Sequence, residues 1–476
     1  MKRLMASFLI LVLFAIICIP STVWGENEET DKGTENDVEI ATTLSPSELE
    51  AEAAILIEQK TGKILFSKNE HQKLYPASTT KILTALLAIE YGNLDDVVTV
   101  GNEANLVAID GSKAGLDLNE EIKLKDLLMG LMLPSGNDAA NTIAVHIGRK
   151  VSNNPNLGIS EAMNAFYDLM NQKVASILQN PNSHFANPHG YHDKEHYTTA
   201  YDLSMIAREA MNYPVFREIV KTYAYDYPDW NGVDPKDPSK KEIRYWRNKN
   251  RLIIEGNPYY YEYATGIKTG YTSAAGHCLV SSASKDGLDV IAVVLNSTKE
   301  GQWTDSLKLL KFGIENFTHY DLVKEGEVIG EPVYVENHSA DDSGELLLVA
   351  EKAFGDVFFK PDIQNIEEKI EINPEITAPI SKGEVLGKVT YMLKGTVLFE
   401  TNLLAGRDVA KKTIFNLPFP DDHKNSPEVD PQTNQGKEKG RPAWYWVVLS
   451  VIFALFLLRS ILLARRRRYR RYLYRR

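Results

Sequence analysis

Residues 76–82 have the sequence Pro-Ala-Ser-Thr-Thr-Lys-Ile and stand at the start of a segment, residues 78–91, whose apolar side chains recur at helical spacing. Ser78 opens the predicted helix and Lys81 follows three residues later, so both side chains lie on one face. A serine hydroxyl becomes a nucleophile when a base takes its proton, and a neutral lysine within hydrogen-bond reach can do this. Taken alone, the motif is more typical of an ordinary helix start, because serine is a common helix cap and lysine a common surface residue.

A second motif, Leu-Pro-Ser-Gly-Asn-Asp at residues 133–138, separates two predicted helices at 124–132 and 139–147. A loop at this point can present Ser135 and Asn137 to a cleft. Both residue types are also good helix caps, so this motif on its own predicts no more than a helix start.

A third motif, Ile-Lys-Thr-Gly-Tyr-Thr at residues 267–272, leads into a predicted strand at 276–284. Lys268 offers a positive charge and Thr269 a hydroxyl to a substrate carboxylate. Gly270 allows another part of the backbone to approach closely.

Composition and charge limit the class of protein. The 476 residues carry a formal charge of −11, but the last 36 residues contain ten arginines and no acid, so the remainder is strongly acidic. This argues against a nucleic-acid-binding protein. Cys18 lies in a predicted leader and leaves Cys278 alone, so the mature chain closes no internal disulfide and depends on a packed core.

Two apolar segments predict export and membrane anchoring. Residues 1–25 combine basic residues, an apolar run and a small final residue, as in a cleaved signal peptide. Residues 443–464, interrupted by Arg459, are just long enough to cross a bilayer, and the arginine-rich tail at 465–476 marks the cytoplasmic side. We expect a single-pass cell-membrane protein with its ectodomain on the cell-wall face; a lipoprotein leader at Cys18 and a surface-lying helix are the disfavoured alternatives.

The pattern between these segments predicts several domains. Strands at both ends of a helical middle predict one α/β unit, at residues 51–318, whose sheet is closed by distant segments. Short strand-like runs separated by turns predict a β-rich domain at residues 319–417. An acidic lead-in at 26–50 precedes the first domain, and a proline-rich linker at 418–442 follows the second.

The order of the three motifs resembles that of the penicillin-binding proteins and serine β-lactamases. The low-molecular-mass D-alanyl-D-alanine carboxypeptidase family is more similar still, over roughly residues 40–417. Its further matching segments are 187–190, 196–202, 248–252 and 272–278. The resemblance implies an α+β β-lactamase/transpeptidase-like domain with an antiparallel sheet and a helical subdomain, followed by a small β-rich domain.

The resemblance also implies the chemistry. Ser78 attacks the carbonyl between the two terminal D-alanines of a peptidoglycan stem pentapeptide, and water hydrolyses the acyl-enzyme; β-lactams acylate the same serine. Lys81 is the general base, Ser135 relays a proton to the leaving amine and Asn137 holds the substrate backbone. For Lys81 to act as a base it must lose its charge, so we expect a desolvated site beside a second cation.

The remaining expected roles concern substrate binding. Lys268, Thr269 and Gly270 bind the terminal carboxylate, and the backbone N–H groups of Ser78 and Tyr271 form the oxyanion hole. No metal and no cofactor are expected.

The sequence departs from the family pattern in two places. Some members carry an arginine in the strand after the lysine motif to seat the carboxylate, whereas this chain has Asp289 in that segment. The Glu-x-x-Leu-Asn segment with which some β-lactamases activate the deacylating water is missing, so we expect penicillin to leave Ser78 slowly.

Three other interpretations compete with this one. Residues His184, His189, His192 and His196 could bind zinc, but they lie outside any His-Glu-x-x-His helix and in a run typical of a polar surface loop. A serine β-lactamase is the nearest enzymatic alternative. A non-catalytic wall-associated scaffold with the same fold is the non-enzymatic one.

Overall fold

The computed structural model describes residues 43–227, 233–234, 237–241 and 244–412. The predicted signal peptide, linker, membrane helix and cytoplasmic tail, and all but the end of the acidic lead-in, lie outside these residues. Within them, no helix has the length and apolar character needed to cross a bilayer.

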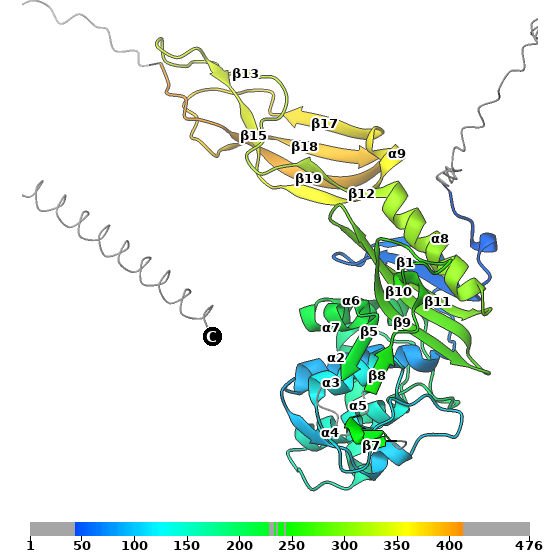
Figure 1. The fold of residues 1–476 in the computed structure, drawn as a ribbon. Helices are drawn as coiled ribbons and strands as arrows, with labels where there is room; N and C mark the ends of the chain where they lie inside the picture. Colours follow the sequence, from blue (N-terminus) through cyan, green and yellow to red (C-terminus); the bar gives the residue numbers. More distant parts are fainter. Residues whose placement is uncertain (1–42, 228–232, 235–236, 242–243, 413–476) are drawn as a thin grey trace, which may run out of the picture. The chain divides into compact units, whose positions relative to one another are not determined.

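A five-stranded antiparallel sheet forms the centre of the first domain (Figure 1). Its strand order is β2-β1-β11-β10-β9, made of β1 (Ala53–Glu58), β2 (Ile64–Lys68), β9 (Ala264–Thr272), β10 (Gly276–Lys285) and β11 (Leu288–Ser297). β1 pairs with β11 in the register Ala53 to Leu295, so segments more than 200 residues apart close the sheet, as the sequence predicts.

Alternate residues of β1 enter two different cores, which explains why all six are buried. Ile55 packs with the helical subdomain, whereas Leu56 packs with α8 (Gly301–Asn316) on the opposite face. The continuous apolar run of β1 therefore reflects a strand covered by helices on both faces.

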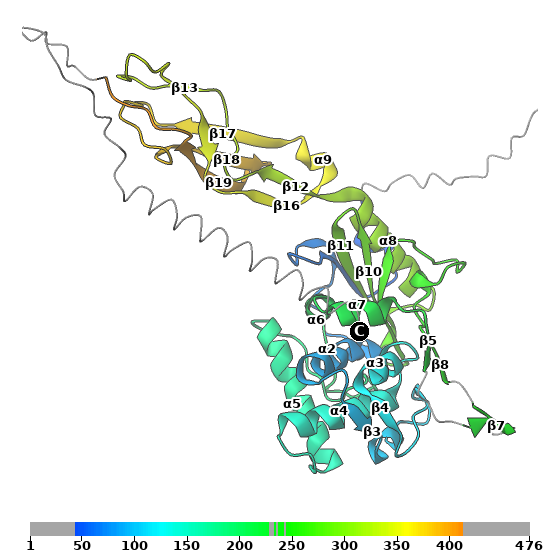
Figure 2. The same ribbon diagram turned by 60° about the vertical axis from the view of Figure 1, so that its left-hand side comes forward.

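The helical subdomain lies between β2 and β9 in the sequence (Figure 2). Its helices are α2 (Lys81–Tyr91), α3 (Leu124–Met132), α4 (Asn137–Val151), α5 (Ile159–Ile177), α6 (Ala200–Met211) and α7 (Pro214–Lys221). Short strand pairs accompany them: β3 (Val97–Thr99) with β4 (Glu121–Lys123), β5 (Ala224–Tyr227) with β8 (Arg244–Arg247), and β6 (Val233–Asp234) with β7 (Asp237–Lys241). The sequence analysis did not identify α5, α6 or α7.

Two expected elements differ in detail. The helix predicted from Ser78 begins with a 3₁₀ turn at Ala77–Thr80, and its regular part starts at Lys81. The third motif lies inside strand β9 and not in a segment before the strand, because β9 and β10 form a hairpin that turns at residues 273–275. Two glycines within β9, at positions 266 and 270, weaken its strand pattern in the sequence.

Residues 317–412 form a β-rich domain with its own apolar core. Its main sheet has the order β15-β19-β18-β17, made of β15 (Leu348–Ala350), β17 (Ile366–Ile372), β18 (Val385–Leu393) and β19 (Thr396–Ala405). β12 (Phe317–Val323) pairs with β16 (Phe354–Phe359), which precedes the short α9 (Lys360–Ile363), and β13 (Val333–Tyr334) pairs with β14 (Glu345–Leu346).

Candidate active site

Ser78 lies in the 3₁₀ turn that precedes α2, and the backbone around it is held by its neighbours. Thr79 Oγ1 donates to the Pro76 carbonyl at 2.7 Å, and Thr80 Oγ1 donates to the Ala77 carbonyl at 2.8 Å. Ala77 itself has a positive φ of 48°, which L residues adopt at a cost. The turn that carries Ser78 is therefore held in an unfavourable conformation by side-chain hydrogen bonds.

Lys81 is completely buried and its amino group points at the serine. Nζ lies 3.0 Å from Ser78 Oγ, 2.7 Å from Asn137 Oδ1 and 2.8 Å from the His189 carbonyl oxygen. A neutral amine has two N–H groups. Asn137 Oδ1 and the His189 carbonyl oxygen accept hydrogen bonds from them, so the lone pair of the nitrogen faces Ser78 Oγ. This is the geometry of a base ready to take the serine proton.

The surroundings of Lys81 favour its neutral form. Burial lowers its pKa well below the usual value, and the positive charges of Lys268 and Lys249 lower it further, against a smaller opposing effect of Asp138. Lys81 therefore has both the desolvation and the neighbouring cation that the sequence analysis expected.

The turn at residues 187–190 holds the base from the other side. Asn187 Oδ1 accepts the Gly190 N–H at 2.7 Å, and Thr84 Oγ1 donates to the Pro188 carbonyl at 2.6 Å. Gly190 has a φ of 81°, and a Cβ placed on it would lie 1.7 Å from the Ala77 carbonyl oxygen. Only glycine therefore fits where this turn packs against the nucleophile's turn.

His196 supports the same region without serving as a metal ligand. Its Nδ1 accepts the Ala186 N–H at 3.1 Å, so in the neutral ring the proton is on Nε2, which lies 2.8 Å from Thr80 Oγ1. Burial lowers the pKa of His196, and that of His189, to about 3. The expectation of a surface loop was wrong for His196, which is buried, and the described residues contain no His, Cys, Asp and Glu cluster suited to a metal.

The second motif forms the turn between α3 and α4. Ser135 has a φ of 68°, and its buried Oγ makes no hydrogen bond within the described part of the chain. Asn137 starts α4 and bonds Lys81 as described above. The next residue, Asp138, accepts backbone N–H groups from Ala114, Gly115 and Leu116 and so ties the facing loop to this turn.

β9 supplies the opposite wall of the site. Lys268 is buried, its Nζ donates to the Thr269 carbonyl at 3.0 Å, and burial together with Lys249 lowers its pKa to about 7. A Cβ on Gly270 would lie 3.0 Å from the Ser78 backbone nitrogen, so the glycine permits the strand to approach the nucleophile.

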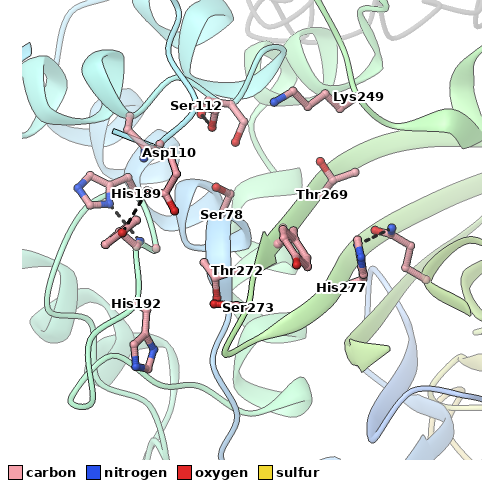
Figure 3. A pocket seen from close by; sticks show the side chains of 18 of the residues that line it. Ser78, Asp110, Ser112, His189, His192, Lys249, Thr269, Thr272, Ser273 and His277 are labelled. Carbon is pink, nitrogen blue, oxygen red and sulfur yellow. Dashed lines mark hydrogen bonds between the residues drawn. The ribbon is translucent and has the colours of Figure 1, made fainter. Parts of the chain in front are cut away.

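The three motifs line one cavity of about 640 Å³. Figure 3 shows Ser78 at its centre, with Thr269 on one side and Asp110 and His189 on the other. Ser135, Asn137, Gly270 and Tyr271 also line it, whereas Lys81 and Lys268 are buried behind the lining.

The cavity contains cations that sequence reasoning missed. Lys249 and Arg251 both line it, although only their segment, and no role, was noted from the sequence. Asp289, which stands in the segment where some family members have an arginine, pairs with Ser284 in the β10–β11 ladder and does not line the cavity. Lys249 could have been identified from the sequence, because it is a basic residue within residues 248–252, a segment already noted as similar to the family.

A serine beside a buried lysine of lowered pKa, with an edge strand across a cleft, defines the site of a serine–lysine acyl-transfer enzyme. Comparisons with known proteins agree. Residues 40–299 match the D-alanyl-D-alanine carboxypeptidase family model, and residues 317–411 match that of the penicillin-binding protein 5 C-terminal domain. The chain belongs to the D-alanyl-D-alanine carboxypeptidase family, which makes it a serine peptidase.

Individual relatives extend over most of the chain. D-alanyl-D-alanine carboxypeptidase DacF of Bacillus subtilis is 31% identical over 374 residues, 76% of this chain and 86% of the relative. D-alanyl-D-alanine carboxypeptidase DacD of Escherichia coli is 30% identical, and the alignment covers 78% of this chain and 90% of the relative.

Solved structures show the same α+β penicillin-binding fold with a β-rich C-terminal domain. The D-alanyl-D-alanine carboxypeptidase DacD of Francisella tularensis aligns with a TM-score of 0.57 and 26% identity, over 78% of this chain and 96% of that one. Penicillin-binding protein 5 of Haemophilus influenzae aligns with a TM-score of 0.55 and 29% identity, over 78% of this chain and 100% of that one.

Proposed function

We propose that the protein removes the terminal D-alanine from peptidoglycan stem pentapeptides and is acylated by penicillins at the same serine. The observation that carries this proposal is the 3.0 Å contact between Ser78 Oγ and the buried Lys81 Nζ, at a cavity that Thr269 lines. The family to which the chain belongs and the names of its relatives support the substrate class.

Acylation starts with proton transfer from Ser78 Oγ to Lys81 Nζ as Oγ attacks the carbonyl carbon of the penultimate D-alanine. The carbonyl oxygen becomes an oxyanion, which the backbone N–H groups of Ser78 and Tyr271 stabilise; each such donor contributes about 2.7–4 kcal/mol in other enzymes. The amide bond then breaks, and the proton that Lys81 took from Ser78 passes through the Ser135 hydroxyl to the leaving nitrogen. The Ser135 hydroxyl can rotate to do this because it has no partner among the described residues. Free D-alanine departs.

Deacylation repeats these steps with water as the nucleophile and Lys81 as the base. Among the described residues that line the cavity, the sole carboxylate is that of Asp110, which accepts a hydrogen bond from Tyr191. Since the described lining offers no further acid to activate water against a penicilloyl group, we expect that ester to persist.

The decisive test has two parts, performed on the full-length chain in detergent. Mass spectrometry after exposure to penicillin should find the added mass on the peptide that contains Ser78. The chain should also release D-alanine from a pentapeptide. Rapid penicillin turnover would indicate a β-lactamase instead, and acylation with no D-alanine release would indicate a wall-associated scaffold.

We also propose that the protein is exported and anchored in the cell membrane. The apolar segments at residues 1–25 and 443–464 and the arginine-rich tail at 465–476 support this. Protease added to intact protoplasts should remove the catalytic domain; complete protection would contradict this topology.

A further inference from the structure

Two cations line the cavity and a third is buried behind it, against one lining carboxylate, that of Asp110, among the described residues. Lys249 and Arg251 line it, Lys268 is buried behind it, and none of the three forms an ion pair with a described carboxylate. Burial lowers the pKa of Lys249, as expected of a cation that lacks a counter-charge. Such an arrangement favours an anionic group of the ligand at this end of the cavity.

Arg251 is the cation best prepared to receive a carboxylate. Its guanidinium carbon lies 5.5 Å from the ring centre of Trp303 and 5.9 Å from that of Tyr259, and these two rings are stacked on one another. The side chain is half-buried and starts the 3₁₀ turn Arg251–Ile253. A guanidinium held against aromatic rings loses little freedom when it binds, and its planar fork matches a carboxylate.

The aromatic wall that holds Arg251 is continuous with β9. Trp303 follows Gln302 in α8, and the Gln302 amide nitrogen lies 3.0 Å from His277 Nδ1. The His277 ring stacks on that of Tyr271, a residue of the third motif, with 4.4 Å between the ring centres. Arg251 and Thr269 therefore line the same cavity from adjoining parts of one wall.

Lys249 is less suited to this role. Figure 3 shows its amino group directed toward Ser112. Its exposed ammonium offers a single point charge and cannot bind two carboxylate oxygens in one plane.

We propose that Arg251 determines the specificity of this enzyme for substrates with a free C-terminal carboxylate, by binding that carboxylate of the leaving D-alanine together with the Thr269 hydroxyl. The inference rests on the proposed function, because it takes D-alanyl-D-alanine as the substrate. Some family members bind this carboxylate with an arginine in the strand that corresponds to β11, where this chain has Asp289. Here Arg251, from the segment before β9, supplies the cation instead.

The test compares two substrates in the full-length chain: an N-blocked lysyl-D-alanyl-D-alanine and the same peptide with a C-terminal carboxamide. Arg251→Gln should lower kcat/KM for the carboxylate substrate about 10- to 100-fold, mainly through KM. It should change kcat/KM for the carboxamide by less than about 2-fold, since that substrate has no charge to lose. Arg251→Lys should recover part of the loss.

Arg247→Gln is the matched control. Arg247 also lies over two aromatic rings, those of Tyr223 and Tyr245 at 5.6 and 5.9 Å, but it is exposed and does not line the cavity. Its replacement should leave both substrates unaffected.

Three results would overturn the assignment of Arg251: equal losses on both substrates, no loss on either, or a carboxylate-selective loss in Lys249→Gln but not in Arg251→Gln. A wild-type chain that is acylated by penicillin but releases no D-alanine would instead refute the proposed function, and this inference with it.

Discussion

Replacement of Gly190 by alanine tests whether the turn at residues 187–190 positions the nucleophile. The added Cβ would lie 1.7 Å from the Ala77 carbonyl oxygen, and this separation must widen to at least 3.0 Å. Ala77 directly precedes Ser78, so the displacement passes to the serine. A misplacement of about 1 Å in a reacting group costs about 100-fold in rate, which is the loss we expect in acylation.

The same substitution also destabilises the fold. Alanine at a φ of 81° costs about 1–2 kcal/mol, and relief of the clash adds about 1–3 kcal/mol to the loss of unfolding free energy. Gly256→Ala is a matched control, because Gly256 has a φ of 79° but no atom within 4 Å of the point where an alanine Cβ would lie. This control should show the backbone cost alone and acylate at the wild-type rate.

The assay is the second-order rate of acylation by a fluorescent penicillin, measured with thermal unfolding of each variant at the same pH. We expect Gly190→Ala to acylate about 100-fold more slowly than Gly256→Ala at a temperature where both are folded. Equal acylation rates in the two variants would show that contact with Ala77 does not hold the serine in place.

The charges around the site lead to three further predictions. Lys268→Gln removes a cation that lowers the pKa of Lys81, so the acid limb of the acylation pH profile should move to higher pH; an unchanged limb would count against Lys81 as the base. Asp138→Asn removes the opposing charge, so the limb should move to lower pH, and weaker bonds to the facing loop should reduce the unfolding free energy by about 1–3 kcal/mol in urea titrations. His189 and His196 have a pKa of about 3 in the folded protein and about 6.5 in the unfolded chain, so the unfolded chain takes up their protons first as the pH falls. Each histidine therefore lowers the free energy of unfolding by about 1.4 kcal/mol per pH unit between pH 6.5 and pH 3. Urea unfolding at several pH values should therefore show a shallower slope in His196→Asn, and equal slopes would contradict the argument.

Much of the site was predictable from local sequence. The spacing of Ser78 and Lys81 places both on one side of a helical turn whatever surrounds them, and the structure confirms their contact. The strand predicted at residues 276–284 coincides with β10, because strand and helix periods depend on near neighbours. Helix α5 was missed, since its apolar positions are sparse and only a few of its residues are buried.

The sequence by itself determined the reactive residues, their order and the two-domain plan. Tertiary structure decided what those residues can do. Lys81 can act as a base because burial and Lys268 together lower its pKa, and the carbonyl of His189, 108 residues away, accepts a hydrogen bond from its amino group. Arg251 lines the cavity with its guanidinium against the ring of Trp303, a residue 52 positions later in the chain. Desolvation and long-range charge depend on the whole fold, and therefore no local pattern of residues reveals them.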